Sequence, residues 1–296
     1  IVSWPVPGLT FVRVDGILRS WDIEGEKQQS KQQPQQNQDP NQGPKRMYLM
    51  EDALTGMHSQ KAYLAFLVLG DRTGVSYYMG ASIAAGEAAD GDSASISFQT
   101  LKSILHSVYN GVDIYKDPFT LDQMKAMVAP LATHTGIITG IPALKSTAGD
   151  TMESEQIERL ASGLQGKDFG MMILAAPIPK AYVTKEEFHV VDQIQRAQEN
   201  EDPEKKRRIK YYLELQDAYL KHIQLGTAIG SWQVGTYFFA PERSIFARLQ
   251  SLIQATYVDE TSRPTPLRTH EIKGLREHVS QFGLVKNQRS GESFQT

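Results

Sequence analysis

The sequence predicts a fold that combines α-helices with a β-sheet, of the α+β or the α/β class. The main observation is a recurring unit, in which a helical pattern is followed by a glycine-bearing turn and a strand-like run, at 97–115, 151–174 and 204–239. The run 169–178 is apolar on both alternating faces, which is typical of a strand covered on both sides. We therefore expect a mixed sheet layered with helices. Two ferredoxin-like halves meeting near Tyr182 would agree with this order.

Changes in composition along the chain predict five segments. The first, 1–27, holds two short β-rich runs separated by Asp15 and Gly16, a dipeptide typical of a hairpin turn. The second, 28–46, is rich in Gln with Pro and Asn, so we expect a flexible linker or long loop. The others are a first α/β half, a second half with a long helix, and a tail leading into a further C-terminal region, at 47–182, 183–272 and 273–296.

The first half is expected to open with another hairpin, because two apolar runs flank the turn residues 70–74. After a loop at 84–95, Ser97 is the expected N-cap of a helix. Thr120 and Gln123 have the spacing of a capping box, and Pro130 should kink or end the helix that they start. The stretch 137–179 then has the pattern strand, helix, strand. We expect it to be the structural centre of the fold.

The second half is expected to begin with a charged, mostly helical connector at 185–200. Asp202, Pro203 and Glu204 have the pattern of a helix start: a cap residue, Pro in the first turn, and an acidic residue at the positive end of the dipole. The helix at 204–225 should be roughly 30 Å long. A strand, a helix and a last short strand are expected at 231–240, 242–257 and 266–272.

Composition excludes several classes of function. The 31 Lys and Arg against 34 Asp and Glu give a net charge of −3, hence no general attraction to nucleic acid. The absence of cysteine excludes disulfides, thiolate nucleophiles and cysteine-ligated zinc. The chain has no run of about 18 apolar residues, so we expect no membrane span. We expect a cytoplasmic protein. Because the sequence starts at Ile1 and stops abruptly at Thr296, we expect a fragment of a longer protein, with processing of a mature chain as the alternative.

The segment 163–168 has a superficial likeness to a phosphate-binding loop. A Walker A loop has four residues between its glycines and a Ser or Thr after the Lys. Here the spacing is shorter, and Asp168 follows Lys167. The segment also follows a helix and precedes a strand, the reverse of the order that points a helix N-terminus at phosphate. We interpret it as a helix stop and expect no cofactor site in this chain.

The remaining polar motifs predict no catalytic residue and no metal site. The 7 histidines are scattered, and His270 next to Glu271 has no second His at the spacing of a zinc helix. His134 is expected in a turn. Acidic pairs such as Glu186 with Glu187 lie in polar segments, where nothing indicates a general acid.

One concentrated basic run could contact nucleic acid or a partner. It comprises Lys205, Lys206, Arg207 and Arg208, with two tyrosines shortly after it. Basic residues interleaved with aromatics are suited to backbone contact and base stacking. Acidic residues immediately before the run reduce its potential, so a solvated helix face is the alternative interpretation.

The order of several motifs resembles the N-terminal, non-motor region of bacterial HerA/FtsK-type ATP-binding proteins. They are the segments 140–145, 157–160, 163–169, 175–178, 225–226 and 230–240. The resemblance extends from about Tyr63 to Thr269. It implies a domain that precedes a hexameric motor moving DNA or protein. ATP and Mg would then bind only in that motor, beyond Thr296. The short charged connector at 185–200 and the Gln-rich segment depart from the family pattern.

Three hypotheses follow for the function. The first is a non-catalytic accessory and oligomerisation domain of a HerA/FtsK-like motor ATPase that translocates DNA or protein. The second is a stand-alone protein-interaction scaffold of a secretion, phage-derived or phage-defence assembly. The third is a small-molecule enzyme, which would need a deep pocket lined by converging polar side chains.

Overall fold

The structure is a computed structural model that describes residues 2–6, 8–16, 49–82, 92–108, 112–140, 159–199, 206–257 and 267–286. Its elements are, in chain order, β1 (Val2–Pro5), β2 (Thr10–Gly16), α2 (Leu49–Ser59), β3 (Tyr63–Gly70), β4 (Val75–Ser82), α3 (Asp92–Val108), β5 (Asp113–Ile114), β6 (Phe119–Thr120), α4 (Leu121–Leu131), β7 (His134–Thr139), β8 (Phe169–Pro177), α6 (Lys180–Glu199), α7 (Lys206–Ile229), β9 (Trp232–Ala240), α8 (Arg243–Tyr257), β10 (Arg268–Glu271), α9 (Leu275–Ser280) and β11 (Gly283–Lys286).

One nine-stranded sheet organises the described part of the chain. Its order is β10-β7-β9-β8-β3-β4-β2-β5, with β6 also paired to β2, and β1 and β11 form a separate pair. Every pairing among the described strands is antiparallel. The fold is therefore α+β, as the sequence predicted. The α/β alternative and a sheet of mixed direction do not apply, since both require parallel strands.

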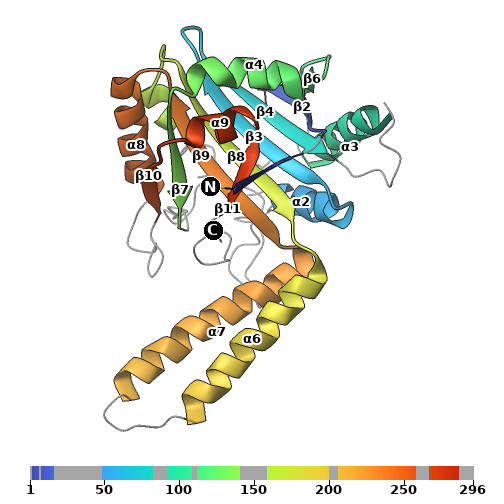
Figure 1. Ribbon diagram of the computed structural model, residues 1–296. Helices are drawn as coiled ribbons and strands as arrows, with labels where there is room; N and C mark the ends of the chain where they lie inside the picture. Colours follow the sequence, from blue (N-terminus) through green and yellow to red (C-terminus); the bar gives the residue numbers. More distant parts are fainter. Residues whose placement is uncertain are drawn as a thin grey trace, which may run out of the picture.

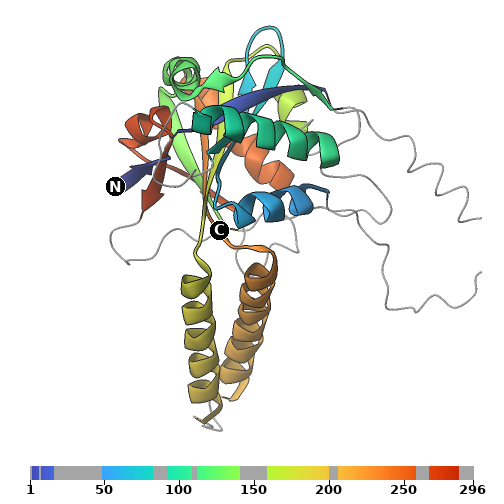
Figure 2. The ribbon, with the colours of Figure 1, turned by 90° about the vertical axis from the view of Figure 1, so that its right-hand side faces the viewer.

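Helices cover both faces of the sheet (Figure 1 and Figure 2). On one face α4 and α9 pack over side chains such as Leu67, Met172 and Tyr237. On the other face α8 packs against Phe238, and α2 and α3 pack against the β3–β4–β2 side of the sheet. Successive strand residues point to opposite faces, so β3, β8 and β9 are apolar on both.

The prediction of a central strand is confirmed, because β8 lies between β3 and β9. The hairpin of β3 and β4 is also confirmed, and so is the capping box of α4. In that box the Gln123 backbone N–H donates to Thr120 Oγ1, and the Thr120 N–H donates to Gln123 Oε1. The helix ends at Leu131, one residue after Pro130. The helix expected between β7 and β8 is described only from residue 159.

Two predictions of turns and caps are wrong. Asp15 and Gly16 do not form a turn: they lie in β2, where Gly16 pairs with Asp113 of β5. Ser97 is not an N-cap, because α3 begins at Asp92 and residues 92–96 contain no Gly or Pro to stop it. In the segment expected as a tail, 273–296, α9 and β11 bury apolar side chains. The second strand expected before residue 27, the Gln-rich segment, most of the predicted loop at 84–95 and the last ten residues lie outside the described residues.

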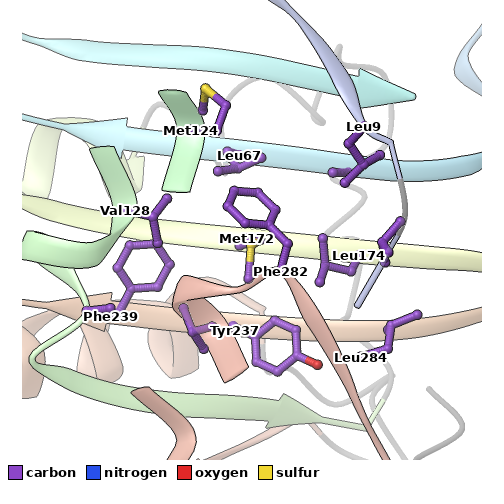
Figure 3. Packing of buried hydrophobic residues seen from close by; sticks show 14 of the residues in the cluster. Leu9, Leu67, Met124, Val128, Met172, Leu174, Tyr237, Phe239, Phe282 and Leu284 are labelled. Carbon is purple, nitrogen blue, oxygen red and sulfur yellow. The ribbon is translucent and has the colours of Figure 1, made fainter. Parts of the chain in front are cut away.

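The two halves expected at 47–182 and 183–272 contribute to one sheet. The position between 182 and 183 falls inside α6, and β8 and β9, on either side of it in the chain, are neighbours. The main core consequently draws on both halves. Figure 3 shows Met172 of β8, Tyr237 of β9 and Phe282, which follows α9, packed together.

Candidate interaction surface

A long helical hairpin leaves the sheet between β8 and β9. The two strands pair up to Pro177 and Trp232, and the Ile178 N–H donates to the Ser231 carbonyl oxygen at 2.9 Å. From there α6 runs outward for 20 residues and α7 returns for 24 residues. At 1.5 Å per residue these helices are about 30 and 36 Å long. Both ribbon views show the hairpin extending away from the body (Figure 1 and Figure 2).

The two helices contact each other through a narrow apolar seam. Val183 and Val190 of α6 and Ile223 of α7 are buried there, with Tyr219 and Leu220 packed against them. Polar contacts follow the seam: the Tyr212 hydroxyl donates to Gln193 Oε1 at 3.2 Å, and Gln224 Nε2 donates to Glu187 Oε1 at 3.3 Å. Because each helix buries only one stripe, most of its surface remains in solvent.

Gln216 is an imperfection in this hairpin. Its side-chain oxygen is buried and has no hydrogen-bond partner among the described residues. A buried, unpaired acceptor costs roughly 1–3 kcal/mol. We expect Gln216→Leu to raise the free energy of unfolding by about 1 kcal/mol, measured by urea denaturation. As a matched control, Gln224→Leu removes a hydrogen bond to Glu187 and should not stabilise; equal gains from both variants would contradict this account.

The hairpin carries most of the exposed large apolar side chains of the described chain. Seven such residues are exposed, and five of them lie on α6 and α7: Tyr182, Phe188, Tyr211, Tyr212 and Leu225. The largest exposed fraction is 70% for Phe188. Scattered single apolar residues are normal on a surface, but several gathered on one projecting element indicate an interaction site.

The predicted basic run lies at the far end of the same hairpin. Lys206 and Arg207 form the start of α7, and Arg208 is exposed one position further along. Lys205 lies outside the described residues, and so do the side chains of Lys206 and Arg207. The described part of the chain therefore places the run at the tip of the hairpin, while its contact with nucleic acid stays a prediction.

A small cavity of about 200 Å³ lies at the base of the hairpin, between α2, α6 and the α7–β9 junction. His58 Nε2 is 3.0 Å from the Ser231 carbonyl oxygen, so this nitrogen carries the proton and donates. The neighbouring Ser59 hydroxyl donates to the Gly56 carbonyl at 2.7 Å. The His58 ring also packs edge-on against Trp232. The contacts of His58 join α2 to the start of β9 at the base of the hairpin, and both His58 Nε2 and the Ser59 hydroxyl are bonded to backbone carbonyls.

The other motifs considered from the sequence have structural surroundings. Gly166 has a left-handed φ of +70° in the turn between a helix and β8, as expected for a helix stop. His134 does not lie in a turn: it starts β7, with its ring near Phe246. His270 is 3.0 Å from Thr139 Oγ1, and Glu271 pairs with Arg243. That ion pair lowers the pKa of the Glu271 carboxyl, chiefly through the hydrogen bond from Arg243.

The described residues show neither a metal-binding cluster nor a membrane-spanning helix. They contain no group of three or more His, Asp or Glu side chains placed to hold a metal ion. Nor does any helix within them combine the length and apolar character needed to cross a bilayer.

Sequence reasoning missed a second stripe on α7, which we call the outer stripe. It consists of Tyr211, Leu215, Ala218, His222 and Leu225, at successive spacings of four, three, four and three residues. Tyr211 is 58% and Leu225 52% exposed. Counting the apolar residues of α7 at heptad spacing would have revealed this stripe in addition to the one that faces α6.

No family model and no curated protein matches this chain.

Proposed function

We propose that this chain is the N-terminal accessory and oligomerisation domain of a HerA/FtsK-like motor ATPase. In this proposal the domain is non-catalytic and contacts its partners through the α6–α7 hairpin. The motor lies in a further region of the protein, where ATP and Mg bind. The assembly is a homo-oligomer, a hexamer by resemblance, which moves DNA or protein in the cytoplasm.

The observation that carries the proposal is the hairpin itself. Ile178 and Ser231 are already hydrogen-bonded neighbours, so two residues would be enough to join β8 to β9. The chain instead makes an excursion of two long helices, whose apolar side chains remain exposed. Such an element is not needed to complete the sheet. A contact with another molecule explains both its length and its exposed aromatic residues.

The test is to remove the hairpin and close the sheet. Residues 179–230 would be replaced by Asn-Gly, a dipeptide suited to a two-residue turn between antiparallel strands. We expect the shortened protein to unfold within a few degrees of the intact chain, because the body keeps its core. We also expect it to lose the concentration-dependent self-association of the intact chain, as measured by sedimentation velocity.

Unchanged self-association after the hairpin is removed would contradict the oligomerisation part of the proposal. The non-catalytic part has its own test, in which purified residues 1–296 are assayed with ATP and Mg. We expect negligible turnover, and robust magnesium-dependent hydrolysis would contradict it.

A further inference from the structure

We infer that α7 pairs with α7 of a second copy of this chain, antiparallel and along the outer stripe. This inference rests on the proposed role of the hairpin in oligomerisation, and it names the partner and the register of one two-fold contact, which joins copies in pairs and does not by itself close a six-membered ring. The outer stripe keeps heptad spacing over four intervals, from Tyr211 to Leu225. That spacing lets one face of a helix stay in contact with another helix. Within the described structure this face meets solvent, with Ala218 and His222 exposed and Leu215 half-buried.

The charges beside the stripe fit a second copy of α7. Glu214 and Lys221 flank the stripe on the side away from α6, one heptad apart. Neither makes an ion pair with another described residue. In an antiparallel pair whose two-fold axis passes between positions 216 and 217, Glu214 lies diagonally across from the partner's Lys221, two residues or about 3 Å along the axis from direct opposition. Symmetry produces this opposite-charge pair twice.

In the same register, the side chains that face each other across the pair are compatible in size and polarity. Leu215 meets the partner's Ala218, so a large residue faces a small one. Tyr211 meets the partner's His222, and the aliphatic stem of Arg208 meets the partner's Leu225. An aromatic ring beside an imidazole, and an arginine stem along a leucine, both bury apolar surface while their polar ends stay in water.

Other antiparallel registers are less favourable. A shift of one heptad toward the base of the hairpin brings Lys221 diagonally beside the partner's Lys221. It also sets the tip of the helix, residue 206, opposite position 234 in the partner's β9, so the tip would run into the body. A shift the other way brings Glu214 diagonally beside the partner's Glu214. In the inferred register residue 206 lies opposite position 227, so each tip ends at the other hairpin's base.

The contact is small. The contact extends from Arg208 to Leu225, a distance of 17 residues or about 26 Å along the helix axis. A two-helix contact of this length falls at the lower end of specific interfaces. We therefore expect a reversible dimer with a dissociation constant on the order of micromolar.

The test reverses the flanking charges. Glu214→Lys brings Lys against the partner's Lys221, and Lys221→Glu brings two Glu residues together. We expect each single variant to raise the dissociation constant about tenfold or more in sedimentation velocity. The double variant, Glu214→Lys with Lys221→Glu, restores opposite charges and should return to within about threefold of the wild type. Asp217→Lys is the matched control, since it makes the same charge change about 120° around the helix from the stripe and should have little effect.

Cross-linking tests the direction of the pairing. The chain has no native cysteine, so a single introduced thiol is unique. In the inferred dimer, two copies of residue 218 are about 5 Å apart along the axis, and two copies of residue 228 about 34 Å. A short bismaleimide should therefore link Ala218→Cys dimers and not Ala228→Cys dimers. Equal linking at both positions would indicate parallel helices and overturn the inference.

The remaining outcomes separate this inference from the proposed function. Loss of association without the hairpin, but none from the charge reversals, would leave the oligomerisation proposal standing and reject the α7 pairing. A double variant no tighter than the single variants, or a wild type that stays monomeric at high concentration, would also reject the pairing.

Discussion

Replacing Gly170 by alanine is expected to lower the free energy of unfolding by about 3 kcal/mol. Gly170 lies in β8 directly opposite Phe239 of β9. A Cβ atom at Gly170 would be 2.1 Å from Phe239 Cε2, far inside van der Waals contact. The Phe239 ring is fully buried at the centre of the main core, so it cannot move without displacing its neighbours. Guanidinium denaturation of both proteins measures the change.

Two controls make this prediction specific. Gly56→Ala places a methyl group in α2, where no atom lies within 4 Å, and should stabilise by about 0.5–1 kcal/mol. In a Phe239→Leu background, the smaller side chain leaves room, so the cost of Gly170→Ala should fall substantially. A cost that is the same in both backgrounds would show that the ring is not the cause.

The pairing of Gly170 with Phe239 is one of four such pairs in the sheet. Each joins a glycine to the phenylalanine directly opposite it on the next strand, and in each the ring lies over the position of a glycine Cβ. The pairs are Gly70 with Phe169, Gly80 with Phe11, Gly136 with Phe238 and Gly170 with Phe239. Each ring occupies the space that a Cβ atom would fill on the opposite strand. A strand shifted along its neighbour would therefore bring a residue with a Cβ against the ring. The pairs therefore help to fix the register of the sheet.

The fold class and most long elements were predictable from the sequence because their signals are local. The apolar run of β8 and the capping box of Thr120 each lie within a few residues. Strand partners are not local, so no pattern in the sequence placed β9 between β7 and β8. Asp15 and Gly16 show the conflict directly. A local turn signal is overridden because β2 continues, to pair with β5 about 100 residues later in the chain.

The candidate site was predictable only in part. The length of α7 and the basic run at its start were evident in the sequence, but exposure was not. Tyr211 and Tyr212 are adjacent in the sequence, and only the position of α6 decides which faces the seam. Tyr212 bonds to Gln193 across the hairpin, while Tyr211 lies on the outer stripe. Distinguishing a core stripe from a contact surface therefore requires knowing what lies beside the helix.

Tyr237→Phe is expected to destabilise the domain by about 2 kcal/mol at pH 8. The Tyr237 hydroxyl donates to the Gly283 carbonyl oxygen at 3.0 Å and accepts from the Val285 N–H at 3.0 Å. It thereby joins β9 to β11. Phenylalanine leaves both backbone groups of β11 buried and unpaired. Chemical denaturation measures the loss, and an unchanged free energy of unfolding would mean that water satisfies these groups.

The effect of this substitution should disappear at high pH. Burial raises the pKa of the Tyr237 hydroxyl to about 12, whereas an unfolded tyrosine has a pKa of about 10. Between these values the unfolded chain has released the proton and the folded chain still holds it, so stability falls as the pH rises. Two pKa units correspond to a contribution of about 3 kcal/mol to the free energy of unfolding. This contribution is fully present below pH 10 and is lost as the pH rises through 12. Tyr257, whose pKa burial also raises, titrates in both proteins and cancels in the comparison. The wild type should therefore lose its advantage over Tyr237→Phe by pH 12, and a gap that stays constant from pH 8 to pH 12 would show that this hydroxyl is not held protonated in the core.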